Sequence, residues 1–318
     1  MKPPYNITPL ILAKVASISE KIGEVKTAYL YHPPAELRRS NRIKTIQSSL
    51  EIEGNTMSVE QVTALISNKR VLAPEKDILE VKNAIATYEQ IDSFKPYSLK
   101  SLLKAHKLLM NGLVNNAGNL RTKSVGIIKG SQTVHVAPPA DRIEFLVEDL
   151  LDYAKKDDDL LLIKSCVFHY EFEFIHPFMD GNGRMGRLWQ TVLLRQQYPV
   201  FDFLPIEALI KEQQKVYYSA LEKSDKLGES TTFVEFMLTI IEHALEDMLS
   251  SQPVTLKGVG RIQLFRNMIG VNTFSRNEYM RHFKDISSAT ASRDLREATD
   301  NRILTRIGEG RTTVYRYL

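Results

Sequence analysis

Residues 176–187 read HPFMDGNGRMGR, a glycine-rich turn that leads into a helix expected over residues 184–197. Gly181 and Gly183 flank Asn182, so the backbone can bend sharply there and expose its N–H groups without obstruction by a Cβ atom. Unpaired N–H groups at the start of a helix favour a bound anion, because they and the helix dipole carry partial positive charge. The turn therefore predicts an anion-binding site.

The side chains of this stretch indicate that the bound anion is a polyphosphate. Arg184 and Arg187 are three residues apart, hence on one helical face, and their guanidinium groups match phosphate oxygens. Asp180 supplies the hard oxygen ligand that Mg²⁺ takes beside phosphates. His176 is the nearby residue of the type that can serve as a general base at neutral pH, because an unperturbed histidine side chain has a pKa near 6.5.

Helical periodicity dominates the remainder of the chain. The first expected helix covers residues 8–31, with Thr8 as its cap and Pro9 as its first residue, and a capping box of Ser58 and Gln61 starts the third. The other expected helices cover residues 35–53, 75–92, 98–113, 142–155, 160–174, 184–197 and 206–250. Two short apolar runs on either side of Lys129-Gly130-Ser131 indicate a β-hairpin over residues 125–136. The fold class expected is mainly α.

The polar stretch 250–253 ends in Pro253 and interrupts the apolar pattern, so it is the candidate linker. We expect three regions: N-terminal helices over 1–94, a core over 95–252 and a module over 253–318.

The C-terminal module is basic. Residues 255–318 carry 12 Lys and Arg against 6 Asp and Glu, whereas residues 1–254 carry 30 against 32. Its helices, expected at 258–269, 275–283 and 288–300, precede two strands within 302–317, an order that resembles a winged helix-turn-helix domain. Arg293 and Arg296 could meet phosphates or base edges, so DNA stays open as a partner beside a second subunit or a target protein.

Composition points to a cytoplasmic protein that does not enter the membrane. The chain has 318 residues and a single cysteine, Cys166, which excludes an intrachain disulfide. No apolar leader follows Met1, and nowhere do eighteen apolar residues follow one another.

The motif as a whole resembles the signature of the Fic family (filamentation induced by cAMP), whose members mostly transfer AMP from ATP to protein hydroxyls. The resemblance extends over about residues 35–250, including Glu173-Phe174-Ile175 before the motif and Tyr217-Tyr218-x-x-Leu221 after it. It implies a Fic-type helical bundle with a hairpin flap, and a catalytic core over 95–252.

The resemblance also implies roles for individual residues. His176 would take the proton of a Ser, Thr or Tyr hydroxyl, and Asp180 would hold Mg²⁺. The residues placed at ATP are Asp180, Gly181, Asn182, Gly183, Arg184, Met185, Gly186, Arg187 and Tyr217, the last near the adenine. The hairpin would pair with an extended segment of the target protein, and a homo-oligomer, a dimer, is expected.

The end of the second helix resembles the family's inhibitory pattern, in the class that carries it upstream of the motif. Residues 49–54 read SLEIEG, with Ser49 and Glu53 as the expected regulatory residues and Gly54 as the left-handed residue after the helix. By this resemblance Glu53 pairs bidentately with Arg187, which could then not hold the terminal phosphate, so the resting enzyme would be weakly active.

Three alternatives stay open. Glu53 could be an exposed carboxylate at a helix end, or the same residue could serve in removing AMP. The chain could also be a DNA-binding regulator whose nucleotide site is a sensor.

Overall fold

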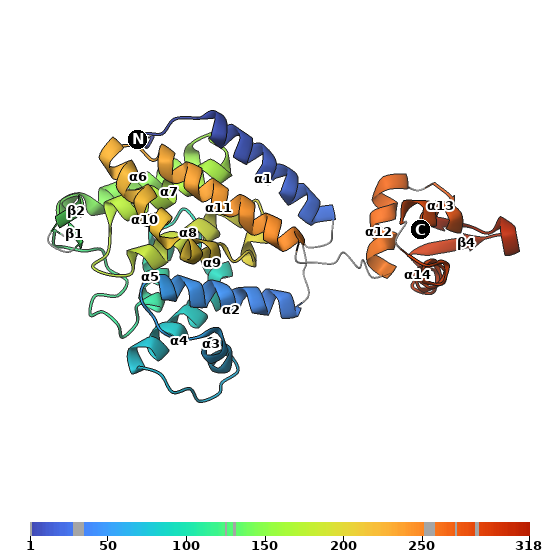
Figure 1. Ribbon diagram of the computed structural model, residues 1–318, viewed down its shortest axis with the longest axis horizontal. Helices are drawn as coiled ribbons and strands as arrows, with labels where there is room; N and C mark the ends of the chain where they lie inside the picture. The colour runs from blue at the N-terminus through green and yellow to red at the C-terminus, as the bar shows by residue number, and fades with distance from the viewer. Residues whose placement is uncertain are drawn as a thin grey trace. The chain divides into compact units, whose positions relative to one another are not determined.

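The structure is a computed structural model that describes residues 2–27, 35–124, 126–129, 132–250, 258–270, 272–283 and 286–318 (Figure 1). Some predicted features lie outside these residues: the end of the first expected helix at 28–31, the hairpin residues Val125, Gly130 and Ser131, and the linker residues Ser251, Gln252 and Pro253. The prediction of a mainly helical protein is confirmed, because the described residues form fourteen α-helices and two small antiparallel sheets.

The chain divides into two compact units, residues 1–23 with 33–249 and residues 24–32 with 250–318. The helices that fall largely within the larger unit are α1 (Pro9–Thr27), α2 (Ala35–Ile52), α3 (Val59–Ile66), α4 (Glu75–Glu89), α5 (Leu99–Leu109), α6 (Ile143–Lys156), α7 (Leu161–Ile175), α8 (Asn182–Leu194), α9 (Ile206–Glu212), α10 (Gln214–Leu227) and α11 (Thr231–Ser250). The predicted boundaries after residues 94 and 252 stay a prediction.

Helix α7 forms the centre of the larger unit and packs against both α6 and α8. Every residue from Leu162 to Tyr170 is buried, so α7 presents no solvent face. A helix that is buried on all sides over such a stretch needs other elements packed around it. The chain leaves this buried helix directly into the motif, which fixes where the motif lies.

Local signals in the sequence define the ends of α1, α2 and α3. The Thr8 hydroxyl accepts the N–H of Ile11 at the start of α1, and Ser58 and Gln61 form the capping box of α3. Gly54 follows α2 with φ +91°, a left-handed conformation in which glycine avoids the steric penalty of a Cβ atom. These predictions are confirmed.

The prediction of continuous helix over 206–250 is wrong, because the segment forms three helices. α10 ends at Leu227, and the next residue, Gly228, is left-handed with φ +68°, which terminates the helical hydrogen bonds. The predicted hairpin is present as β1 (Gly126–Lys129) and β2 (Gln132–Val136), which pair antiparallel.

The smaller unit contains α12 (Gly258–Ile269), α13 (Arg276–His282) and α14 (Ser288–Asp300), with strands β3 (Phe274–Ser275), β4 (Leu304–Ile307) and β5 (Val314–Tyr317) in the order β3-β5-β4. β3 was not predicted, since two residues are too short for a periodic pattern.

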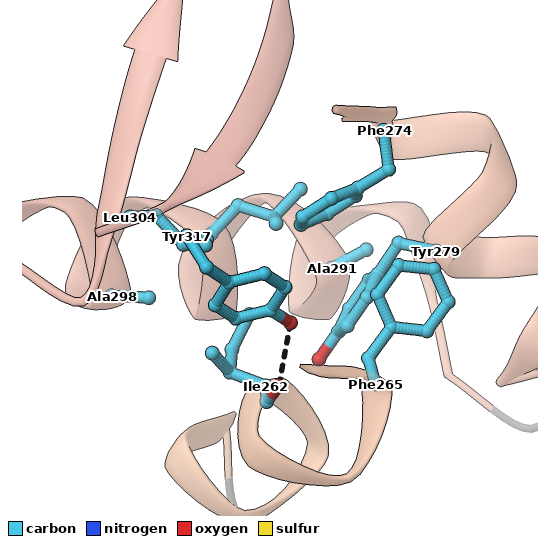
Figure 2. Packing of buried hydrophobic residues seen from close by; sticks show 9 residues of the cluster. Ile262, Phe265, Phe274, Tyr279, Ala291, Ala298, Leu304 and Tyr317 are labelled. Carbon is cyan, nitrogen blue, oxygen red and sulfur yellow. Dashed lines mark hydrogen bonds between the residues drawn. The ribbon is translucent and has the colours of Figure 1, made fainter. Parts of the chain in front are cut away.

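The smaller unit has a core of its own, which consists of nine buried side chains (Figure 2). The rings of Phe265 and Tyr279 meet edge to face at 5.3 Å, and the hydroxyl of Tyr317 donates to the carbonyl of Ile262 at 2.6 Å. Asp294, 2% exposed, accepts two hydrogen bonds from Arg261. An interior of this kind satisfies its buried charges internally.

Among the described helices none combines the length and the hydropathy that crossing a membrane would require.

Candidate functional site

The motif forms the connection between α7 and α8. α7 ends at Ile175, and the next residue, His176, is left-handed with φ 50° and ψ 59°. A non-glycine residue in this region costs about 1–2 kcal/mol, so surrounding contacts must hold it. Gly181, also left-handed, precedes the first residue of α8, Asn182. The helix was expected from residue 184, so its predicted start is two residues late, and the glycine-rich turn lies at a helix N-terminus as expected.

The side chain of Asn182 closes this turn. Its Oδ1 accepts the N–H of Phe178 and its Nδ2 donates to the carbonyl of the same residue, both at 2.9 Å. Asn182 is 2% exposed, so its amide is engaged within the turn. The groups of this turn that could bind an anion are therefore the backbone N–H groups at the start of α8. Their contact with phosphate stays a prediction.

Asp180 is the exposed carboxylate of the turn. Its side chain is 57% exposed, and Oδ1 accepts from the N–H of Gly181 at 2.6 Å and lies 3.2 Å from Nη2 of Arg184. One accessible carboxylate beside a helix N-terminus fits Mg²⁺, which takes one or two protein carboxylates together with substrate phosphates. Asp180 is the residue that would hold this ion.

His106 on α5 fixes the backbone of Asp180. Its Nδ1 accepts the N–H of Gly118 at 2.8 Å, so Nε2 carries the proton and donates to the carbonyl of Asp180 at 3.0 Å. The imidazole stacks on the Phe178 ring with 3.6 Å between centroids. Burial, with a contribution from nearby Arg184, lowers the pKa of His106 to about 4. His106 is therefore a neutral, fixed support at physiological pH.

His176 is oriented by backbone carbonyls. Its Nδ1 lies 3.4 Å from the carbonyl oxygen of Glu173, which can only accept, so Nδ1 carries the proton and Nε2 is the basic nitrogen. Its own carbonyl accepts from Nε of Arg121 at 2.7 Å. The imidazole tautomer is thus the one that a general base at Nε2 needs.

Arg121 is a buried cation bound to carbonyl oxygens. It is 2% exposed, and its guanidinium donates to the carbonyls of Ile175 and His176 on the motif side. On the hairpin side it donates to the carbonyls of Lys123 and Pro138 at 2.8 and 2.5 Å. One side chain therefore joins the base of the hairpin to the turn that carries His176.

Arg187 is paired with the end of α2. Its Nη2 lies 2.8 Å from Oε1 of Glu53, while Nε donates to the Ser49 hydroxyl at 3.1 Å and Nη2 to the Ser49 carbonyl at 3.0 Å. Burial alone would lower the pKa of Arg187, but Glu53 raises it, so the guanidinium stays charged. The expected bidentate pair is instead a single ion pair, in which Nη2 contacts Glu53 while Nε and Nη2 donate to Ser49.

Glu53 also lies against the glycine-rich turn. A Cβ atom on Gly183 would be 2.5 Å from Oε1 of Glu53 and 3.1 Å from Nη1 of Arg187. The carboxylate therefore occupies the space next to the first turn of α8, where an anion would approach.

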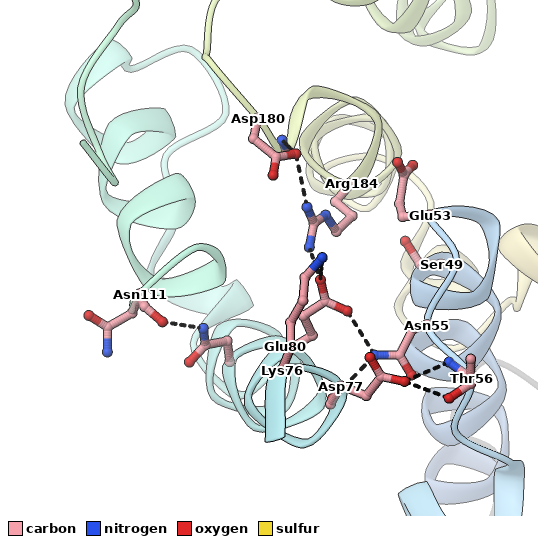
Figure 3. A network of polar contacts seen from close by, with 12 residues as sticks. Ser49, Glu53, Asn55, Thr56, Lys76, Asp77, Glu80, Asn111, Asp180 and Arg184 are labelled. Carbon is pink, nitrogen blue, oxygen red and sulfur yellow. Dashed lines mark hydrogen bonds and ion pairs between the residues drawn. The ribbon is translucent and has the colours of Figure 1, made fainter. Parts of the chain in front are cut away.

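Arg184 lies between two carboxylates, as Figure 3 shows. Nη2 contacts Asp180, and Nη1 is 3.3 Å from Oε1 of Glu80 on α4. The guanidinium is 5% exposed, and its Nε has no hydrogen-bond partner among the described residues. Both motif arginines are thus tied to acidic residues from the N-terminal helices.

Three predicted nucleotide residues lie in the interior. Met185 is fully buried, and a Cβ atom on Gly186 would be 2.9 Å from the His169 ring on α7. Tyr217 is 1% exposed, and its hydroxyl donates to Nε2 of His169. In this structure all three serve helix packing, and their contact with ATP stays a prediction. The neighbouring Tyr218 is 44% exposed and is the accessible aromatic of α10.

Sequence reasoning missed His106, Arg121 and Glu80. Each acts through a contact between segments far apart in the chain, with sequence separations of 74, 55 and 104 residues. No local motif marks them.

Comparisons with known proteins identify a family profile, related sequences and similar structures. The sequence profile described as "Fic/DOC family" matches residues 96–194. A crystal structure of a Fic family protein from Desulfovibrio desulfuricans G20 is 43% identical, with a TM-score of 0.76 over 100% of this chain and 98% of that one. Fic-1 from C. elegans, residues 134–508, shares the fold at 19% identity and a TM-score of 0.60, over 74% of this chain and 73% of that one.

Among curated proteins, "Protein adenylyltransferase Fic" of Nematostella vectensis is 25% identical over 253 residues, which is 74% of this chain and 56% of that protein. The chain spans about half the length of the curated relatives it matches.

Proposed function

This chain belongs to the Fic family, and from that premise we propose that it transfers AMP from ATP to a Ser, Thr or Tyr hydroxyl of a target protein. The observation that carries the proposal is the motif turn itself. A histidine with its basic Nε2, an exposed carboxylate and the first residue of helix α8 lie within seven consecutive residues, 176–182.

In the proposed reaction, the target hydroxyl oxygen attacks the α-phosphorus of ATP, and the bond from that phosphorus to the bridging oxygen of the β-phosphate breaks. His176 takes the hydroxyl proton at Nε2, AMP becomes esterified to the target and pyrophosphate leaves. The N–H groups at the start of α8 and the guanidinium of Arg187 oppose the charge on the phosphates. Mg²⁺ held by Asp180 would neutralise part of this charge.

We further infer that Glu53 restrains the reaction. Arg187 cannot hold a γ-phosphate while it is bound to Glu53 and Ser49, and a γ-phosphate at that place would meet the Glu53 carboxylate. ATP would then bind with its α-phosphate out of line for attack. The resting protein is proposed to be weakly active.

Transfer of label from ATP carrying ³²P at the α-phosphate tests both statements. The Glu53→Gly protein should label itself or proteins of a lysate roughly ten- to a hundredfold more than the wild type, as expected when a charge-assisted contact is restored. His176→Ala in the same background should abolish the label. Glu51→Gly is the matched control, since Glu51 pairs with Lys211 instead.

An absence of label in the Glu53→Gly protein, with ATP bound, contradicts AMP transfer. Loss of AMP from a premodified protein in the presence of intact Glu53, but not of Glu53→Gly, would identify removal of AMP as the activity of this site.

The target is proposed to bind at the hairpin β1–β2. A hairpin offers an edge with unpaired N–H and C=O groups to an extended segment of another protein. Through Arg121 its base is connected to the turn that carries His176.

The smaller unit supports a second candidate, DNA binding by a winged-helix module. Within α14, Arg293 and Arg296 are exposed, and the hydroxyl of Ser287 caps the helix. Binding of a DNA duplex by the full chain, with affinity that falls at higher salt and that is lost in the Arg293→Ala/Arg296→Ala protein, would support it. If the wild type and the double variant bind the duplex equally well, DNA binding through α14 is contradicted.

A further inference from the structure

Glu80 is an interior carboxylate that touches two functional segments at once (Figure 3). It is 6% exposed; its Oε1 lies 3.3 Å from Nη1 of Arg184, and its Oε2 accepts from Nδ2 of Asn55 at 2.8 Å. A buried carboxylate with both oxygens engaged has little freedom to rotate, because each alternative orientation loses a charge-assisted hydrogen bond.

Arg184 connects Glu80 to Asp180. Its other terminal nitrogen, Nη2, lies 3.2 Å from Oδ1 of Asp180. The guanidinium is buried, whereas Asp180 is more than half exposed. The orientation of the exposed carboxylate is therefore supported from within, by a cation that Glu80 holds in place.

Asn55 connects the same chain of contacts to α2. It follows Gly54, and its N–H donates to the carbonyl of Leu50 at 3.1 Å in the last turn of α2. The contacts Asn55–Glu80–Arg184–Asp180 thus run from the end of the inhibitory helix to the motif. They are separate from the pair of Glu53 with Arg187.

We propose that Glu80 is a positioning residue, which holds Arg184 so that Asp180 presents its carboxylate to a magnesium-bound nucleotide. The inference rests on the proposed function only in taking Asp180 as the residue that holds Mg²⁺. It gives the end of α2 a second connection to the nucleotide site.

The test is the Mg²⁺ dependence of nucleotide binding, measured with a fluorescent ATP analogue in the Glu53→Gly protein. Glu80→Gln keeps the side-chain shape and an oxygen for Asn55, but removes the charge that holds Arg184. Its half-saturating Mg²⁺ concentration should rise about five- to tenfold, as expected for one weakened charge-assisted contact. Binding in EDTA should change less than about twofold, because without the ion Asp180 contributes no ligand.

Asp77→Asn is the matched control. Asp77 lies on the same helix and holds the same segment, since its carboxylate accepts the N–H and hydroxyl of Thr56 at 3.0 and 2.6 Å. Its Mg²⁺ dependence should equal that of the parent protein. An equal rise in both variants would mean general loosening of the junction between α2 and α4, and would overturn the proposal.

A second variant covers the case in which Glu80→Gln does not fold, which thermal unfolding reports. Glu80→Asp retains the charge but is one methylene shorter, so its Mg²⁺ requirement should rise less than that of Glu80→Gln. An unchanged requirement in a folded Glu80 variant overturns the proposal. Because binding requires no AMP transfer, a protein that binds the nucleotide and transfers nothing refutes the proposed function alone.

Discussion

Glu53 and Arg187 meet across 134 positions of the sequence, with Oε1 of the carboxylate 2.8 Å from Nη2 of the guanidinium. Arg187 is buried and Glu53 is partly exposed, at 1% and 30% of their side-chain surfaces. The arginine lies on the motif helix, whereas Glu53 directly follows α2 and is the more exposed partner of the pair. This asymmetry determines how the pair should respond to substitution.

Removal of Glu53 should make the protein discriminate ATP from ADP. In the wild type Arg187 is occupied, so a γ-phosphate gains no partner and the two nucleotides should bind alike. In Glu53→Gly we expect ATP to bind about tenfold more tightly than ADP, the effect of one added charge-assisted contact. Isothermal titration calorimetry measures both affinities. The idea fails if the ratio of affinities is the same in the two proteins.

Gly181→Ala should destabilise the protein more than Gly228→Ala. Both glycines are left-handed, at φ +85° and +68°, which costs a side chain about 1–2 kcal/mol. Only at residue 181 would the new Cβ meet another side chain, with Sδ of Met110 at 2.7 Å, whereas at residue 228 nothing lies within 4 Å. Thermal unfolding compares the two, and equal losses would show that Met110 moves aside at no cost.

His106 should make the folded protein less stable as the pH falls. Its folded-state pKa of about 4 lies below the ordinary value near 6.5, so the neutral form is favoured by folding. Its contribution is fully present above pH 6.5 and is lost as the pH falls from 6.5 towards 4, since the unfolded chain binds the proton first.

The measurement is the thermal midpoint of wild type and His106→Gln between pH 4 and 7. Buried His169, whose pKa is lowered to about 3, adds the same trend to both proteins, so the difference between them isolates residue 106. A difference that does not vary with pH would contradict a lowered pKa for His106 in the folded protein.

Arg121→Met should cost several kcal/mol of stability, about 1–3 kcal/mol for each buried carbonyl left without a donor. Lys123→Met is the control, because Lys123 contributes its backbone carbonyl, which the substitution retains. Chemical denaturation reports both changes. If the two variants unfold alike, the guanidinium contacts contribute nothing measurable.

Much of the fold follows from local chemistry that a sequence displays. Gly54, a residue with left-handed backbone, marks the end of a helix. Ser58 and Gln61 mark the start of the next, and the turn at 176–187 marks a helix N-terminus. Such features depend on residues within one or two turns of each other, so periodicity and capping patterns suffice to predict them. Gly228 was equally visible, but the apolar period on both sides of it favoured one long helix.

The residues that hold the motif turn in place could not be predicted from such local patterns. His106 falls in an amphipathic helix, where a polar residue ordinarily faces solvent, yet it is 1% exposed and touches the turn. The guanidinium of Arg121 donates to four backbone carbonyls, and no pattern of side chains in the sequence predicts such contacts. Their roles arise only when distant segments pack together.

The order of α2 and α8 along the chain has a consequence for protein synthesis. A ribosome releases α2 well before the motif helix, because chains emerge from the N-terminus. Glu53 is therefore already made when Arg187 folds into place. No newly made copy passes through a period in which the motif is finished but Glu53, the proposed restraint, is still untranslated.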